Sequence, residues 1–370
     1  MIFKFSKRNS VRFVLFAYIP PTFAAALINT SGLTSEISFF VSSNENKLVS
    51  WRDEAIISYF SFDLLRNLKR ELPTKPLLPR INILMNKQIA IQMDDLSKID
   101  YDYDTSFMIA IEGQKRVYKI ARAVDLMLTL LPFEAGFYRD HNVRVKFVGH
   151  PLADIIPLAN DKLGARGKLG IAESETLVAI LPGSRAGEVK YIAESFIEAA
   201  RYIREARSDV QFVIPCVNKD RRDQIQALVN EHGADLPIRL IDGQSRELMA
   251  ASDFVLLASG TAALEAMLLK KPMVVSYRVA WLTHAIMKRL LKVPFVSLPN
   301  LLAGKELVPE LLQDAAEPKR IAEAALKLMS PEVSAPIVSS FDALHQSLRL
   351  NASEEAADAI VEVIEGKQKT

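Results

Sequence analysis

The sequence predicts an α/β protein whose parallel strands are covered by helices on both faces. From about residue 117 onward, short apolar runs alternate with segments of helical periodicity. Strands that are apolar on both faces and separated by helices are typical of doubly wound folds. The length of 370 residues exceeds one ordinary domain and suits two. We therefore expect a doubly wound α/β architecture in a two-domain chain.

The expected elements follow one another in regular order. The apolar runs that predict strands are 126–131, 145–148, 177–181, 212–214, 238–241, 254–257 and 273–276. Helices are expected between them, at 221–229, at 262–269 and after residue 186. The residues that share one face of the helix after 186 are Val189, Ile192, Phe196, Ala199 and Ile203.

We expect three parts in the chain: an N-terminal domain over 1–154, a second domain over 155–345, and a C-terminal helix over 346–370 that packs back toward the first domain. Asn351 and Glu354 have the spacing of a capping pair and predict where this helix begins.

The N-terminal third differs from the rest of the chain. Only Gly32 precedes Gly113, so the glycine-rich turn of a nucleotide-binding domain is missing there. A basic start followed by the apolar stretch 11–28 resembles a signal peptide, but an arginine and a proline pair interrupt the stretch. We therefore expect a strand or buried segment rather than a cleaved signal or a membrane-spanning helix.

Composition excludes several classes of protein. The one cysteine, Cys216, rules out an internal disulfide framework and a zinc site built on several thiolates. The five histidines show no metal-ligand spacing. A net charge of +2 neither demands nor excludes an anionic partner, and we expect no nucleic acid among the partners. We predict no metal and no cofactor.

Two segments have the form of anion-binding turns. In 181–188 (LPGSRAGE) and in 257–265 (LASGTAALE), a buried strand runs through a glycine turn into a helix. Such a turn leaves backbone N–H groups and the positive end of a helix free for a phosphate. Arg185 suits a phosphate clamp, and Glu265 suits a ribose diol. The structural alternatives are a helix capped by Ser184 beside an ordinary surface arginine, and a tightly packed second helix with Glu265 exposed.

A third segment, 296–310, reads as an apolar loop containing Asn300 and leading into a helix that begins near Glu306. Asn300 either binds a base edge or a sugar hydroxyl, or is a buried asparagine that holds the loop together.

Taken together, these segments resemble the lipid-A-disaccharide synthase family. The resemblance covers about residues 113–365 and is carried, in order, by GQKRV (113–117), PFE (132–134), FVGHPLAD (147–154), 181–188, 258–265 and 296–310. It implies a GT-B fold, in which two doubly wound α/β domains face a cleft. It also implies an inverting hexosyl transfer of 2,3-diacylglucosamine from its UDP carrier to 2,3-diacylglucosamine 1-phosphate, which forms the β-1′,6 disaccharide of lipid A and UDP.

The resemblance also implies where the ligands bind. The residues expected to bind UDP are Gly183, Ser184, Arg185, Glu188, Ser259, Gly260, Thr261, Ala262, Glu265 and Asn300. Acylated substrates imply a cytoplasmic protein at the surface of the inner membrane of a Gram-negative bacterium. The residues expected to contact that membrane are Trp281, Lys288, Arg289 and Lys292, on a helix whose structural alternative is ordinary packing against the sheet.

Residues 1–110 depart from the family pattern. The family's Gly-Glu-x-Ser-Gly-Asp turn, its aspartate segment and its tryptophan run are not found there. This part is a diverged domain, a replaced domain or a translation in the wrong frame. The catalytic base is therefore unassigned, with Asp100 and Asp102 as candidates from an acidic loop. Two other hypotheses stay open: a nucleotide-binding relative with impaired catalysis, and another GT-B enzyme that acts on a UDP-sugar.

Overall fold

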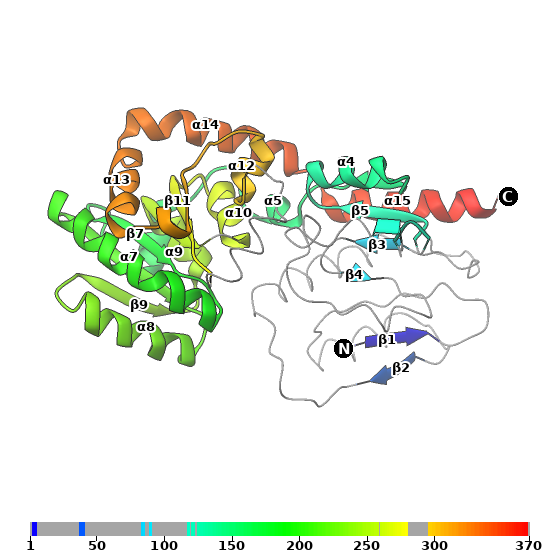
Figure 1. Ribbon diagram of the computed structural model, residues 1–370. Helices are drawn as coiled ribbons and strands as arrows, with labels where there is room; N and C mark the ends of the chain where they lie inside the picture. The colour runs from blue at the N-terminus through cyan, green and yellow to red at the C-terminus, as the bar shows by residue number, and fades with distance from the viewer. Residues whose placement is uncertain are drawn as a thin grey trace. The chain divides into compact units, whose positions relative to one another are not determined.

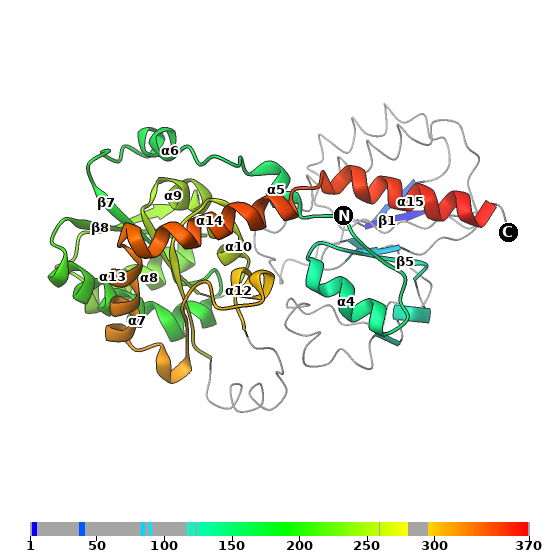
Figure 2. The same cartoon turned by 90° about the horizontal axis from the view of Figure 1, so that it is seen from above.

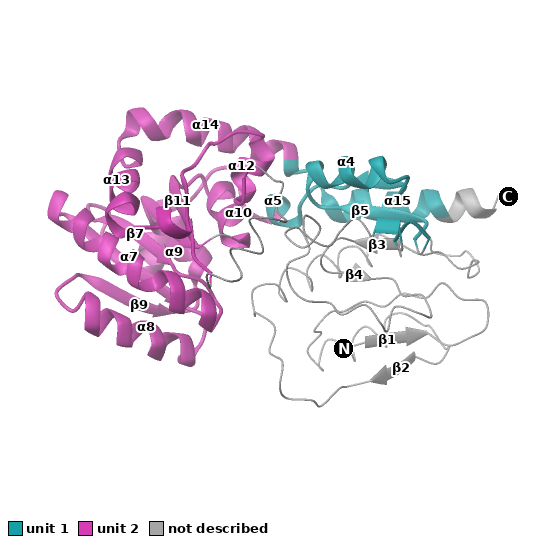
Figure 3. Ribbon diagram, viewed as in Figure 1, with its two compact units in different colours: residues 1–154, 348–370 teal, residues 155–347 magenta. Residues whose placement is uncertain are grey.

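The computed structural model describes residues 117–368, apart from 119, 123, 259 and 280–294, together with four short strands before residue 117. The chain divides into two compact units (Figure 3), residues 1–154 with 348–370 and residues 155–347. In the described part of the chain, no helix combines the length and the apolar character that crossing a bilayer requires.

Unit 2, residues 155–347, is built on a six-stranded parallel sheet (Figure 1). Its strands are β7 (Thr176–Leu181), β8 (Val210–Cys216), β9 (Ile238–Asp242), β10 (Phe254–Ala258), β11 (Met273–Tyr277) and β12 (Glu310–Leu312), in the order β12-β11-β10-β7-β8-β9. The parallel α/β architecture predicted from the sequence is confirmed. The chain builds outward from β7 to β9 and then returns to β10 on the other side of β7. The β7–β10 pair is thus the point where the strand order reverses.

Helices cover both faces of this sheet. On one face, α7 (Ala186–Ala206), α8 (Lys219–His232) and α13 (Pro318–Leu328) share a core with alternate residues of the strands. Against the other face lie α9 (Ser245–Ala251) and α10 (Thr261–Leu268), with α6 (Lys162–Leu169) and α12 (Leu298–Ala303) packed on them. The long α14 (Pro331–Leu348) follows α13 and crosses unit 2 (Figure 2). Each strand of the centre is therefore buried on both sides.

Helix α7 confirms the periodicity predicted for it. All five residues expected on its apolar face are buried, and Phe196 is fully enclosed. Burying a large apolar side chain contributes roughly 1.5–3 kcal/mol, so this face fixes the helix firmly against the sheet. Its first residue, Ala186, is thereby held close to the carboxyl end of β7.

Unit 1 has a smaller sheet in the order β4-β3-β5-β6, made of β3 (Ile83–Met85), β4 (Ile89–Ala90), β5 (Leu126–Thr129) and β6 (Val145–Phe147). Strands β3, β5 and β6 are parallel, and β4 is antiparallel to β3. The other elements described in this unit are the strand pair β1 (Ile2–Phe5) and β2 (Ile37–Phe40), and the helices α4 (Pro132–Asp140), α5 (Pro151–Ile155) and α15 (Ala352–Gln368).

The start of α15 differs from the predicted capping pair. Asn351 has a left-handed backbone, with φ 56°, rather than the extended conformation of a capping residue. Instead, the carboxylate of Asp154 accepts the N–H of Asn351 at 3.0 Å and that of Ala352 at 2.7 Å. The cap thus comes from a residue far away in the sequence, and it ties the C-terminal helix to the rest of unit 1. Lys146 and Glu355 add an ion pair of 3.0 Å.

The helix predicted near Glu306 is also corrected. The helix in this region is α12, which contains Asn300 and ends before Gly304. Gly304 lies in the left-handed region at φ 65°, and the chain from there to β12 is not helical. The apolar residues 298–302 (LPNLL) therefore form a helix rather than a loop.

Candidate functional site

The two predicted anion-binding turns leave the sheet side by side. Leu181 at the end of β7 pairs with Leu257 near the end of β10, so the segments that follow these two strands start at neighbouring positions. They flank the point where the strand order reverses, which is where doubly wound sheets bind their ligands. The helices that begin there, α7 and α10, direct their positive ends to the same edge of the sheet.

The turn after β7 is organised by Glu188. Its carboxylate accepts the N–H groups of Ser184 at 2.9 Å and Arg185 at 3.2 Å, and it lies 3.1 Å from Nη1 of Arg185. Gly183 permits this close approach: its φ is 113°, and a Cβ there would lie 2.5 Å from that of Glu188. Arg185, not Ser184, is the residue at the N-cap position. The alternative in which Ser184 caps the helix is therefore wrong.

Glu188 itself does not fit the predicted contact with UDP. A carboxylate only accepts hydrogen bonds, and this one already accepts from the turn, so a diphosphate would meet like charge there. We therefore assign Glu188 the role of holding the turn in shape. Two kinds of group remain available to bind a phosphate. They are the half-exposed Arg185 guanidinium and the N–H groups of Ala186 and Gly187, which have no partner within the described part of the chain.

The turn after β10 is open. Gly260 has a φ of 146°, a conformation that favours glycine, and nothing would crowd a side chain there. Helix α10 begins at Thr261, which is exposed like Gly260, while Ala262 is half-buried. Ser259 lies outside the described residues. The start of α10 therefore presents backbone to solvent beside the turn after β7.

Glu265 is buried, which rules out the alternative in which it is an exposed residue of a packed helix. Its side chain is 2% exposed, and Oε2 lies 3.4 Å from Nε of Arg246. An ionised carboxylate needs such a partner in a buried position. Arg246 was missed by sequence reasoning, although it follows Gly243 in a third strand-turn-helix segment at the same edge of the sheet.

The amide of Asn300 is fully engaged within the chain. Nδ2 donates to the carbonyl of Val308 at 2.9 Å and to Glu310 at 2.8 Å, and Oδ1 accepts from the N–H of Leu307 and Val308. The residue is 0% exposed, so no donor is left for a base or sugar. The structure supports the alternative in which Asn300 holds the segment together, and we do not include it in the proposed site.

The family model described as lipid-A-disaccharide synthetase matches residues 113–362. The chain belongs to this family.

Two curated lipid-A-disaccharide synthases illustrate the similarity. That of Hahella chejuensis is 56% identical over 252 residues, 68% of this chain and 64% of that protein. That of Azotobacter vinelandii is 53% identical over 253 residues, 68% of this chain and 66% of that protein. The chain thus spans slightly less than two thirds of the length of these relatives. A glycosyltransferase from Rickettsia africae has a similar fold, with a TM-score of 0.50 at 9% identity over 93% of this chain and 88% of that one.

Several residues for which a catalytic or membrane-binding role was predicted lie outside the described part of the chain. They are the candidate bases Asp100 and Asp102 and the proposed membrane contacts Trp281, Lys288, Arg289 and Lys292.

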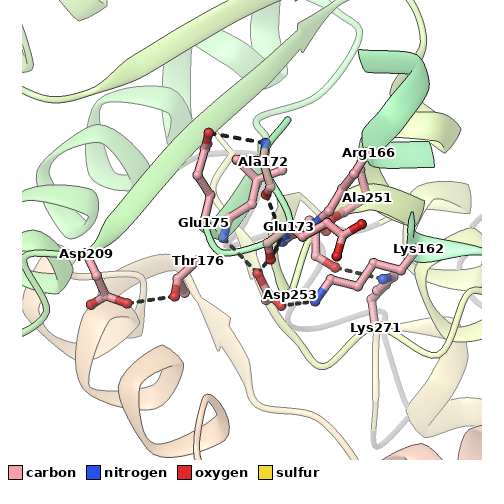
Figure 4. Close-up of polar contacts among 12 residues, drawn as sticks. Lys162, Arg166, Ala172, Glu173, Glu175, Thr176, Asp209, Ala251, Asp253 and Lys271 are labelled. Carbon is pink, nitrogen blue, oxygen red and sulfur yellow. Dashed lines mark hydrogen bonds and ion pairs between the residues drawn. The ribbon is translucent and has the colours of Figure 1, made fainter. Parts of the chain in front are cut away.

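A second polar cluster lies at the opposite, amino edge of the unit 2 sheet (Figure 4). Asp253, just before β10, pairs with Lys162 and with the buried Arg166 at 2.8 Å, and it accepts the N–H of Leu177 at the start of β7. Arg166 also donates to three backbone carbonyls. The Arg166 guanidinium and the Asp253 carboxylate are thus fully engaged with neighbouring groups. We infer that this cluster holds α6 against the sheet.

Lys271 is a buried part of that cluster. Its ammonium group donates to the carbonyls of Ala250 at 2.8 Å and Ser252 at 2.7 Å. Burial is the main cause that lowers the pKa of Lys271 to about 7; the neighbouring charges of Lys162 and Arg166 act in the same direction, and Asp253 opposes them. The cluster is therefore sensitive to pH although it is remote from the nucleotide turns.

Proposed function

We propose that unit 2 binds the UDP part of a nucleotide sugar at the edge where β7 and β10 end. The diphosphate lies against the starts of α7 and α10 and is clamped by Arg185, and the ribose hydroxyls donate to Glu265. The observation that carries this proposal is the pairing of Leu181 with Leu257, which brings both turns together. Unpaired N–H groups, helix ends and an arginine stabilise the charge on a departing diphosphate without a metal.

Membership in the family indicates the substrates. We propose that the donor is UDP-2,3-diacylglucosamine and the acceptor is 2,3-diacylglucosamine 1-phosphate. The 6-hydroxyl oxygen of the acceptor attacks C1 of the donor sugar, the bond between C1 and the diphosphate oxygen breaks, and UDP leaves. The hydroxyl proton goes to a base, and inversion gives the β-linked disaccharide. Among UDP-sugar enzymes, the family match favours this reaction over an epimerase or another transferase.

Transfer by this chain is expected to be slow. The family match begins at residue 113, so the candidate bases Asp100 and Asp102 lie in a part of the chain that it does not cover. This observation favours a second candidate function, which is binding of the nucleotide sugar without turnover.

One pair of measurements separates the two candidates. Purified protein is incubated with radiolabelled donor and acceptor, and UDP binding is measured by calorimetry on the same sample. We expect UDP to bind and product to form well below about 1 per second. Faster transfer would show that a base exists in the chain, and Asp100→Asn and Asp102→Asn would be the first variants to make. Absence of UDP binding would overturn both candidates.

The acyl chains of these substrates also require a bilayer. We propose that the protein works in the cytoplasm at the surface of the inner membrane, with the segment around Trp281 in contact with anionic lipid. No nucleic acid takes part in the proposed reaction.

A further inference from the structure

Two neighbouring helices of unit 2 bring together a cluster of metal-binding side chains. Glu194 and Glu198 lie one turn apart on α7, and His232 is the last residue of α8. One carboxylate oxygen from each glutamate and a ring nitrogen of His232 all lie within 4.8 Å of one another. The cluster is formed between α7 and α8 and includes none of the residues proposed to bind UDP.

The cluster follows from the direction of the helices. Helices α7 and α8 each connect one parallel strand to the next, so they run in the same direction and pack side by side. Glu198 and His232 lie at about the same distance from the starts of their helices. The spacing of Glu194 and Glu198 puts both carboxylates on one face. The sequence separation of His232 explains why no motif indicated the site.

The local charge favours a cation. Besides the two carboxylates of α7, Oε2 of Glu231 lies 3.8 Å from Nε2 of His232. Arg201, on the same helix as the two glutamates, is already paired with Asp235 through two contacts of 2.5 and 2.9 Å. Arg201 also donates to the carbonyl of His232 at 2.8 Å, which fixes the backbone that carries the imidazole.

We propose that Glu194, Glu198 and His232 form a site for a divalent transition-metal ion of the zinc class. An imidazole nitrogen with two carboxylate oxygens is a donor set that Zn²⁺ accepts, whereas Mg²⁺ and Ca²⁺ prefer oxygen alone. Ligand atoms about 2.1 Å from a tetrahedral ion are roughly 3.4 Å apart, so the three groups need to close by little more than about 1 Å. Glu194 is exposed and Glu198 and His232 are partly buried, which leaves the carboxylates free to adjust.

The bound ion would join α7 to α8. Three protein ligands leave at least one coordination position for water, which is the arrangement of an exchangeable rather than a closed structural site. Since α7 begins at the turn that carries Arg185, the ion would stiffen the layer that positions this turn.

The test is a titration of the full chain with Zn²⁺, followed by calorimetry. We expect a single site in the wild type and a loss of affinity of roughly tenfold or more in His232→Ala and in Glu198→Gln, because each removes a ligand. Glu205→Gln is the matched control, since it removes an exposed carboxylate from the same helix outside the cluster, and it should bind as the wild type does.

Thermal melting of the same proteins gives a second measure. Zn²⁺ should raise the melting temperature of the wild type and of Glu205→Gln and raise that of His232→Ala much less. If His232→Ala does not fold, Glu194→Gln replaces it, because the Glu194 side chain is exposed. No binding to the wild type, or equal affinity in wild type and ligand variants, would overturn the proposal.

Discussion

In the proposed nucleotide site, Arg185 places a half-exposed guanidinium at the start of α7. Its guanidinium is 53% exposed and pairs with Glu188 through Nη1, which leaves Nε and Nη2 for a phosphate. A hydrogen bond to a charged group contributes about 1.5–3 kcal/mol, so Arg185→Ala should weaken UDP binding roughly tenfold or more. Titration calorimetry with UDP measures the change.

The control for this variant is Arg320→Ala, because Arg320 forms an exposed pair with Glu317 at the same helical spacing on α13. Arg320→Ala should leave the affinity for UDP unchanged. Equal affinity in Arg185→Ala and wild type would remove Arg185 from the site.

Glu265 is expected to recognise the ribose, because a buried carboxylate held by Arg246 accepts hydrogen bonds and donates none. Wild-type protein should prefer UDP over 2′-deoxy-UDP, which has lost one of the two hydroxyls. Glu265→Ala should lower the affinity for UDP roughly tenfold, abolish this preference and leave binding of inorganic diphosphate nearly unchanged. Calorimetry with the three ligands supplies the comparison.

Because Glu265 is buried, thermal melting must first show that Glu265→Ala folds. Glu247→Ala removes an exposed carboxylate next to Arg246 and should bind all three ligands as the wild type does. If Glu265→Ala weakens UDP and diphosphate to the same extent, Glu265 shapes the site instead of contacting the ribose.

At the scale of elements, the polar cluster that fixes α6 to the sheet contains Lys271, whose protonation changes with pH. The folded-state pKa of about 7 lies below the ordinary lysine value of 10.5, so the unfolded chain binds more protons between these two values. Stability from this group is therefore complete above about pH 10.5 and is lost as the pH falls toward 7. A shift of this size corresponds to a few kcal/mol across that window.

Lys271→Met should remove this dependence, since methionine keeps the length and has no charge to bury. We expect the free energy of unfolding, measured with urea from pH 7 to pH 10, to rise more steeply for wild type than for Lys271→Met. Lys168→Met, at an exposed position of α6, serves as the control and should follow the wild type. Parallel curves for Lys271→Met and wild type would contradict the lowered pKa.

Elements were predictable where their signal is local. Strands β7 and β10 were predicted from continuous apolar runs, because each strand is buried on both faces. Helix α7 was predicted from apolar residues at helical spacing, because one of its faces is buried. Strand β12 has only three residues and begins with Glu310, so no apolar run marks it. The cap on α15 was missed because its acceptor, Asp154, is nearly two hundred positions away from Asn351.

At the scale of the whole molecule, the sequence could indicate two anion-binding turns but not that they meet. Their meeting depends on the strand order, which places β10 directly beside β7. Long-range packing also decides which residues belong to the proposed site and which of the predicted residues do not. Arg246 pairs with Glu265 from another helix. The side chain of Asn300 donates hydrogen bonds to the carbonyl of Val308 and to Glu310. Pairings of this kind leave no pattern along the chain.

Also at the scale of the whole molecule, we expect the proposed binding to the membrane to depend on Lys288, Arg289 and Lys292. Each basic residue near an anionic surface contributes about 1 kcal/mol, so replacing all three with glutamine should weaken binding by about two orders of magnitude. Binding of the wild type should also fall as salt is added, because exposed charges are screened. Co-flotation with phosphatidylglycerol vesicles measures both effects.

The charge change itself needs a control at another place on the molecule. Lys319, Arg320 and Lys327 are exposed on α13, and their replacement by glutamine removes the same three charges. This control variant should float with anionic vesicles almost as well as the wild type does, because the attraction falls off within a Debye length of the surface. Equal losses in the two triple variants would mean that net charge governs the attraction. Equal flotation of wild type and the 288–292 variant would instead show that these residues do not contact lipid, and the search for the contact would then move to residues 1–112.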